Sequence, residues 1–121
     1  MKRTLMQMYV TNSADAVLFY QKAFNATIGN NWRNPDGSCA HVEIDAYGQI
    51  IAIAEAPDDM VRGNNLQFCL HFNEDERDKV RQAYDVLREG ATIVCDIDQP
   101  SWSPYMFALT DKFGVYWCVF I

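Results

Sequence analysis

The sequence lacks a basic tract and a long apolar run, and each absence excludes a class of protein. The ten Lys and Arg residues are scattered and the formal net charge is -6. This balance argues against a nucleic-acid partner, because phosphate binding requires clustered positive charge. No segment is long enough to span a bilayer, and residues 1–7 contain no apolar signal core. We therefore expect a cytoplasmic protein without a membrane partner.

The sequence also lacks the C-x-x-C spacing that is typical of zinc ligands and redox motifs. Its four cysteines are Cys39, Cys69, Cys95 and Cys118, and each lies in or beside an apolar run. A free cysteine in such surroundings behaves as a small hydrophobic residue. We therefore expect reduced thiols rather than a zinc site or a disulfide framework.

What the sequence does contain is enough apolar material for one globular domain, since half of its 121 residues are hydrophobic. The apolar residues are concentrated in the last stretch, where a charged turn at Gly114 precedes an apolar run through Ile121. A run so rich in β-branched and aromatic residues predicts a buried strand. Alternation places Trp117 and Val119 on one face of it, and Tyr116, Cys118 and Phe120 on the other.

The rest of the chain predicts two similar halves, each a strand, a helix and three further strands. In the first half, Thr11-Asn12-Ser13 supplies N-cap side chains and Asn25 ends the helix. In the second half, Asn73 and Glu76 have capping-box spacing and Gly90 ends the helix. The expected strands are residues 5–10, 26–32, 39–45, 49–55, 66–72, 91–97, 106–110 and the final run. The expected helices are residues 14–24 and 74–89.

The registers of the two halves indicate an internal duplication. Ala26-Thr27-Ile28 and Ala91-Thr92-Ile93 both follow a helix end, and they are separated by nearly the same interval as Gly48 and Gly114. We therefore predict an α+β fold of two βαβββ modules. The modules span about residues 1–60 and 65–121 of a single domain.

At this point the chain resembles the vicinal oxygen chelate superfamily of glyoxalases, bleomycin resistance proteins and ring-cleaving dioxygenases, and within it the PhnB-like branch. Nearly the whole chain is covered, and the closing motif is the most specific part. Asn25 departs from the family's usual Gly, and Met106-Phe107 from its usual aromatic residue followed by Gly. The motifs on which this resemblance rests are Asn12-Ser13-Ala14-Asp15-Ala16, Phe19-Tyr20, Phe24, Pro35-Asp36-Gly37, His41-Val42-Glu43, Trp102-Ser103-Pro104, Thr110-Asp111-Lys112-Phe113-Gly114-Val115 and Trp117.

The resemblance implies a curled mixed sheet with a U-shaped cleft and helices on the convex side. Strand alternation then assigns residues to the cavity face: Leu5, Gln7, Tyr9, His41, Glu43, Ala52, Gln67, Cys69, His71, Tyr116, Cys118 and Phe120. The family's four metal-ligand positions correspond to Leu5, Ala52, Gln67 and Cys118. Leu and Ala have no side-chain donor atom, Gln is a weak one, and Cys prefers softer ions. We therefore expect no metal and no cofactor.

His41 and Glu43 are the candidate catalytic pair, because residues two apart share one face of a strand. Glu43 could act as a base or orient His41, which could transfer a proton. The alternative is structural: His41 makes a satisfied hydrogen bond, and Glu43 meets solvent at the cleft.

The candidate ligand-binding residues are uncharged polar and aromatic side chains on the cavity face and its rim: Gln7, Tyr9, Gln67, Cys69, His71, Trp102, Tyr116 and Cys118. The aromatic members could stack on a flat ligand, and the alternative for them is core and dimer packing. We favour a protein that binds a small organic molecule without a metal. The alternative is a lyase, isomerase or dioxygenase that uses an atypical metal site or His41 and Glu43.

We expect a homodimer, because family modules of this kind commonly pair across a two-fold axis and small domains gain buried core by pairing. Light scattering at micromolar protein should give about twice the 13.9 kDa of one chain. A mass of one chain throughout that concentration range contradicts the expectation.

Overall fold

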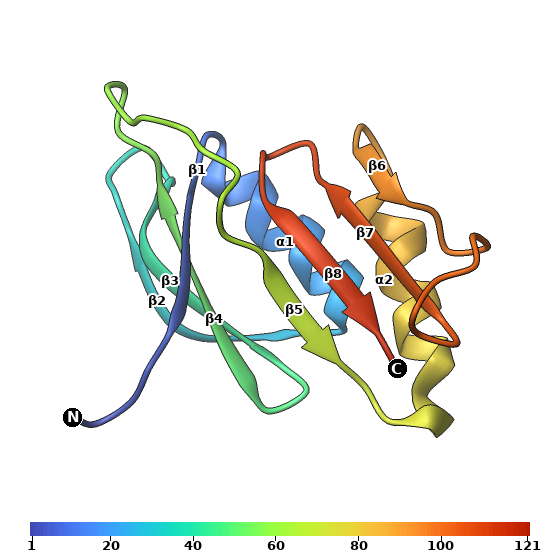
Figure 1. Ribbon diagram of the computed structural model, residues 1–121. Coiled ribbons are helices and arrows are strands. Elements are labelled where there is room, and N and C mark those ends of the chain that lie inside the picture. The colour runs from blue at the N-terminus through green and yellow to red at the C-terminus, as the bar shows by residue number, and fades with distance from the viewer. The chain divides into compact units, whose positions relative to one another are not determined.

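A computed structural model describes all 121 residues, and the chain divides into two compact units. The first unit is Met1–Val61 and the second is Arg62–Ile121. Figure 1 shows that each unit consists of a twisted sheet and helical turns.

The first unit is a four-stranded sheet with one helix. Its strands lie in the order β1-β4-β3-β2, in which β1 and β4 are parallel and the other pairs antiparallel. The sheet is open: helix α1 connects β1 at one edge to β2 at the other, and the chain returns through β3 to β4, which pairs with β1 in parallel. The elements are β1 (Met6–Val10), α1 (Ser13–Phe24), β2 (Thr27–Arg33), β3 (Cys39–Ala46) and β4 (Gln49–Glu55).

The second unit repeats this topology, with strand order β5-β8-β7-β6 and a parallel β5–β8 pair. The prediction of an α+β fold of two βαβββ modules is therefore confirmed. The elements are β5 (Phe68–His71), η1 (Glu74–Glu76), α2 (Arg77–Leu87), β6 (Thr92–Cys95), β7 (Met106–Thr110) and β8 (Tyr116–Phe120).

Two strands of the second unit are shorter than the alternation predicts. The predicted strand 66–72 begins only at Phe68. Leu66 is 78% exposed, so no burial of its side chain favours pairing of this residue with the neighbouring strand. The predicted strand 91–97 narrows to Thr92–Cys95, and its pairing with β7 shifts between Ile93 and Cys95. Such an irregularity bends the strand and ends the regular ladder.

Helix α1 lies within a residue of its predicted bounds, but it is capped from elsewhere in the chain. Asn12 adopts a left-handed conformation and its side chain makes no cap hydrogen bond. Instead, Glu55 on β4 accepts hydrogen bonds from the backbone N–H groups of Asn12 and Ser13, at 3.2 and 3.0 Å. A carboxylate there satisfies helix donors and complements the helix dipole. Asn25, with φ 47°, ends the helix as predicted.

The second helix begins with the predicted capping box. The backbone N–H of Asn73 donates to Glu76 Oε2 at 2.8 Å, and η1 leads into α2. The apolar residues Val80, Ala83, Tyr84 and Leu87 are the buried residues of α2. No helix in the chain combines the length and apolarity needed to cross a membrane.

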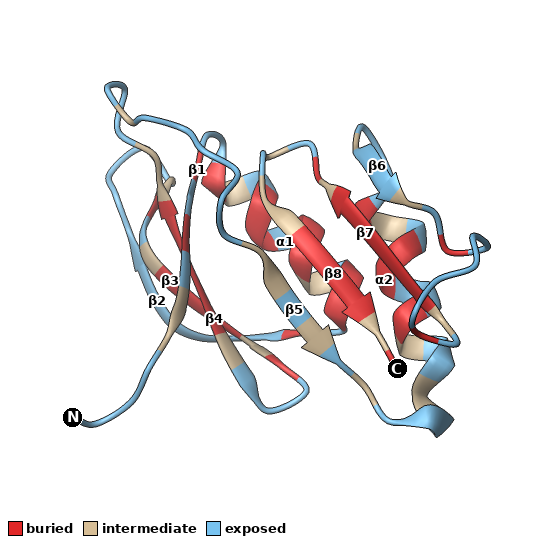
Figure 2. Cartoon of the chain, in the orientation of Figure 1, coloured by how far each residue is buried: buried red, intermediate tan, exposed pale blue.

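The central strands of each sheet hold the core of the unit. Helix α1 packs on β3, β4 and β1, and α2 packs on β8. Figure 2 shows β4, β7 and β8 as mostly buried. Val10 on β1 and Trp117 and Val119 on β8 have no exposed surface.

The last turn is organised by the buried carboxylate of Asp111. Its Oδ1 accepts from the backbone N–H groups of Phe113 and Val115, at 2.9 and 3.1 Å. Its Oδ2 accepts from Trp117 Nε1 at 2.8 Å. The turn requires φ 86° at Gly114, a conformation that side chains disfavour. One carboxylate thus joins the turn to the core of β8.

Trp117→Ala is expected to be among the most destabilising single substitutions, by about 3–5 kcal/mol in the free energy of unfolding. Trp117 is fully buried, its ring meets Phe68 edge-on at 5.3 Å, and its loss removes a hydrogen-bond donor from buried Asp111. Urea denaturation measures the change. Gln82→Ala, at an exposed position on α2, is the near-neutral control. Equal losses in the two variants would contradict this description of the core.

Candidate functional site

The sheet of the first unit carries a polar face whose centre is one row of paired residues. Gln7 on β1 lies opposite Ala52 on β4, and Ala52 lies opposite Glu43 on β3. Paired residues on adjacent strands point to the same face. Two of the predicted site residues, Gln7 and Glu43, therefore share a face across the small side chain of Ala52.

Glu43 is the most strongly bonded residue on this face. Arg3 Nη1 and Nη2 donate to its Oε2 and Oε1 at 3.1 and 2.7 Å, a two-pronged ion pair. His41 Nε2 lies 3.0 Å from Oε1, and Asn30 Nδ2 donates to Oε2 at 3.3 Å. Glu43 is only 4% exposed, so the expectation that it meets solvent is wrong. A carboxylate removed from water requires such partners.

These contacts determine the protonation of Glu43. Hydrogen bonds from Arg3 and then from His41 lower the pKa of its carboxyl group from 4.5 to about 2, although burial opposes the shift. A carboxylate with this pKa is ionised throughout the physiological range and is a weak base. The geometry therefore suits Glu43 to orienting Arg3 and His41.

Aromatic side chains border this polar cluster. Trp32 on β2 pairs with His41 on β3, with ring centroids 5.6 Å apart, and it is 58% exposed. Gln7 Nε2 donates to the hydroxyl of Tyr9 at 2.9 Å, and Tyr9 is 49% exposed. The predicted residues Gln7, Tyr9, His41 and Glu43 thus belong to one face of the first sheet.

The second sheet carries the other predicted site residues, in two adjacent rows. Cys69, Cys118 and Ala108 pair across β5, β8 and β7. The next row contains His71, Phe120 and Met106. The side chains within each row share a face of the sheet.

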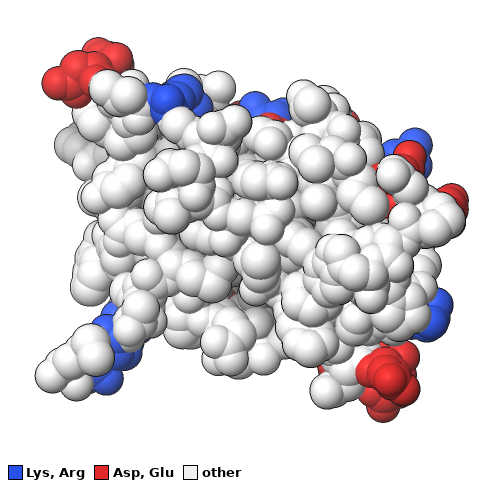
Figure 3. Space-filling view, viewed as in Figure 1, with Lys and Arg blue, Asp and Glu red and all other residues white.

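An aromatic stack occupies one end of this second face. The His71 and Phe120 rings are nearly parallel, with centroids 4.4 Å apart and planes at 18°. Trp102 meets Phe120 edge-on at 4.9 Å and is 71% exposed. Gln67 and Tyr116 are partly exposed, and Gln67 Oε1 accepts from Cys69 Sγ at 3.4 Å. The surface over β8 shows no charged side chain in Figure 3.

The resemblance assigns metal ligation to Leu5, Ala52, Gln67 and Cys118, and these side chains do not suit a divalent ion. Leu5 and Ala52 have no side-chain donor atom. Burial, followed by the nearby Cys69 and Cys95 thiols, raises the pKa of the Cys118 thiol to about 11, which disfavours the thiolate that a metal ligand must be. No three His, Cys, Asp or Glu side chains of the chain are grouped so that they could hold a metal ion.

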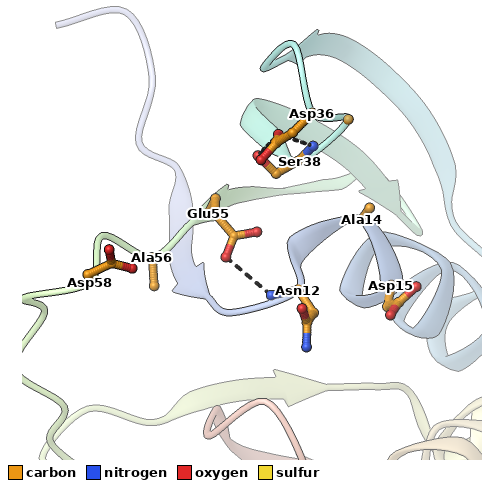
Figure 4. Close-up of a pocket in the computed structure, with 9 residues that line it drawn as sticks. Asn12, Ala14, Asp15, Asp36, Ser38, Glu55, Ala56 and Asp58 are labelled. Carbon is orange, nitrogen blue, oxygen red and sulfur yellow. Dashed lines mark hydrogen bonds between the residues drawn. The ribbon is translucent and has the colours of Figure 1, made fainter.

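A separate pocket of about 490 Å³ lies beside the N-terminus of α1 (Figure 4). Asp15, Asp36, Glu55 and Asp58 contribute carboxylates to its lining. Two of these already have partners: Glu55 caps α1, and Asp36 accepts from the hydroxyl and backbone N–H of Ser38. The hydroxyl and then the backbone N–H of Ser38 lower the pKa of Asp36. These bonds stabilise the helix start and the neighbouring turn.

Sequence reasoning missed three residues of the first face, namely Arg3, Asn30 and Trp32. Arg3 lies before β1 and outside any strand, so alternation assigns it to no face, and its contact with Glu43 spans 40 positions. Asn30 and Trp32 lie on β2, whose pairing with β3 shifts between Ile28 and Asn31. A bulge of this kind cannot be located from periodicity alone.

Comparison with known protein families gives a match over almost the whole chain. The model of the Glyoxalase/Bleomycin resistance protein/Dioxygenase superfamily matches residues 4–119. An uncharacterised protein of Mycobacterium bovis is 25% identical over 118 residues, covering 91% of this chain and 76% of the relative.

Solved structures of similar fold cover the chain almost completely. A protein of Pseudomonas aeruginosa has a TM-score of 0.80 at 14% identity, covering 99% of this chain and 97% of its own. The PhnB protein of Bacillus cereus has a TM-score of 0.78 at 17% identity, with coverages of 99% and 98%. A fosfomycin resistance protein of Listeria monocytogenes has a TM-score of 0.66 at 14% identity, with coverages of 98% and 88%.

Glu43 should make the stability of the protein depend on pH below its ordinary pKa of 4.5. Its pKa in the folded state is about 2, so the unfolded chain takes up a proton first as the pH falls. The stabilisation is therefore complete above pH 4.5 and is lost progressively down to about pH 2. Urea midpoints of the protein and of Glu43→Gln, measured across this interval, should converge toward low pH. Parallel pH profiles would show that Glu43 does not make this contribution.

Proposed function

Because this chain belongs to the glyoxalase, bleomycin resistance protein and dioxygenase superfamily, we propose that it binds a small, flat organic molecule without a metal ion. The observation that carries the proposal is the stack of His71, Phe120 and exposed Trp102 on the second sheet. An exposed aromatic edge beside parallel rings offers a ligand ring both stacking and edge contacts.

The polar groups around the stack favour a neutral ligand that donates or accepts hydrogen bonds. Gln67 and Tyr116 supply amide and hydroxyl groups at the border of the uncharged face. No Lys, Arg, Asp or Glu lies within β5 or β8, so a highly charged ligand would have no partner on these strands. On the first unit, Gln7 and Tyr9 hydrogen-bond to each other and are both exposed, so they form a separate candidate contact surface.

The donor atoms of the chain favour binding without the family's metal. Two of the four ligand positions hold Leu5 and Ala52, and the raised pKa of the Cys118 thiol disfavours its thiolate. We propose no step through a metal ion.

An enzyme that uses His41 for proton transfer is the second candidate. The observation that favours it is the 3.0 Å contact between His41 Nε2 and the ionised Glu43, which orients the imidazole. In this case Glu43 positions His41, and Arg3 holds Glu43 in place. A reaction lost in both His41→Ala and Glu43→Gln, with binding retained, would favour the enzyme.

Thermal unfolding in the presence of neutral heteroaromatic amides, such as quinoline carboxamides, tests the binding proposal. A ligand at about 100 times its dissociation constant adds roughly 2.7 kcal/mol, which is a shift of several degrees. We expect His71→Ala and Trp102→Ala to reduce this shift. Leu18→Ala, 63% exposed on α1 of the first unit, should preserve it.

Divalent metals provide the opposing measurement. Zinc, nickel and manganese should produce no specific stabilisation. The proposal is wrong if stoichiometric metal co-purifies and its removal abolishes an activity, or if no member of the amide panel shifts the transition.

A further inference from the structure

Two cysteines of the second sheet lie directly beside each other. Cys69 on β5 and Cys118 on β8 are partners in a parallel ladder, so their side chains share one face. Neighbouring strands are about 4.7–4.9 Å apart, within the roughly 4.4–6.8 Å between Cα atoms that a disulfide spans. Both thiols are free, and the proximity of Cys69 contributes to the raised pKa of the Cys118 thiol.

The two thiols differ in access to solvent. Cys69 is exposed at the edge strand of the sheet, whereas Cys118 is 5% exposed. Cysteine oxidation follows exposure, so Cys69 is the thiol that an oxidant meets first. Cys118 lies behind it as a second, sheltered thiol.

Cys95 belongs to the same row but is too far along it to pair with Cys118. Cys95 pairs with Ala108, and Ala108 pairs with Cys118, so two strand spacings separate the cysteines. This is about 9–10 Å, and disulfides do not form beyond about 7 Å between Cα atoms. Cys95 therefore provides a matched control within the same sheet.

We propose that Cys69 and Cys118 form a redox-active dithiol that peroxides oxidise to an intramolecular disulfide. In the first step, the Cys69 sulfur attacks one oxygen of hydrogen peroxide. An S–O bond forms and the O–O bond breaks, giving a sulfenic acid on Cys69 and a first molecule of water. Cys69 is oxidised and the peroxide is reduced.

In the second step, the Cys118 sulfur attacks the sulfur of the sulfenic acid. The S–S bond forms, the S–O bond breaks, and the departing hydroxide takes the Cys118 proton as a second molecule of water. Two thiols and one peroxide thus become one disulfide and two waters. A thiol reductant reverses the reaction by exchange.

The disulfide has a structural consequence for the edge of the second sheet. Strand β5 pairs with β8 alone, through four residues from Phe68 to His71. A covalent bond between these strands holds β5 in register and prevents the edge from opening. The proposed disulfide is inferred from the pairing of β5 with β8 and from the exposure of Cys69. It therefore does not depend on whether the proposed ligand binds.

The test is oxidation of the full chain by stoichiometric hydrogen peroxide, followed by mass spectrometry under non-reducing conditions. We expect a loss of about 2 Da, for the two thiol hydrogens, and a linked peptide pair containing Cys69 and Cys118. Dithiothreitol should restore the original mass. Cys69→Ala and Cys118→Ala should abolish the loss, and Cys95→Ala should preserve it.

Three outcomes would overturn the proposal: oxygen addition to single cysteines without a cross-link, a cross-link through Cys39 or Cys95, or a disulfide between two chains. Cys69→Ala changes an exposed side chain, so it carries the test even if the buried Cys118→Ala does not fold. Thermal unfolding of both forms gives a second readout, because the oxidised chain should unfold at a higher temperature.

Discussion

The parallel pairing of the first and last strands of each unit is the constraint on which the rest depends. In the first unit it sets β1 against β4, and in the second it sets β5 against β8. A shift of one residue would move every side chain of the strand to the opposite face. The observed registers place Gln7 beside Ala52 in one sheet and Cys69 beside Cys118 in the other. Both candidate faces are consequences of these two ladders.

The same topology carries two different chemistries. On the first sheet the buried carboxylate of Glu43 is compensated by Arg3, His41 and Asn30, so the polar groups mainly satisfy one another. On the second sheet the corresponding surface is built from thiols, an imidazole and aromatic rings. A bound ligand removes water from the protein surface that it covers. For a neutral ligand, this desolvation costs less free energy on an uncharged face than over an ion-pair cluster. This difference is why the second sheet is the stronger binding candidate.

The fold followed from local patterns, whereas the decisive contacts of the site did not. Alternation predicted β4 and β7 with their observed bounds, and the capping box of Asn73 and Glu76 is present. These signals are local, so a single sequence contains them. The pairing of Arg3 with Glu43 joins residues 40 positions apart, and no local pattern specifies which charge meets which. The row of Cys69 and Cys118 likewise needed the register of β5 and β8.

The capping of α1 by Glu55 has a consequence for how the chain acquires its structure during synthesis. The carboxylate lies 42 positions after Ser13, whose backbone N–H it accepts. At about 5–20 residues per second, a ribosome needs roughly 2–8 seconds to produce the cap after the helix start. The same interval leaves β1 without its parallel partner, since β4 contains Glu55. During that interval the nascent first unit therefore exposes an uncapped helix and an unpaired strand edge. Chaperones that bind exposed apolar segments can bind it at this stage.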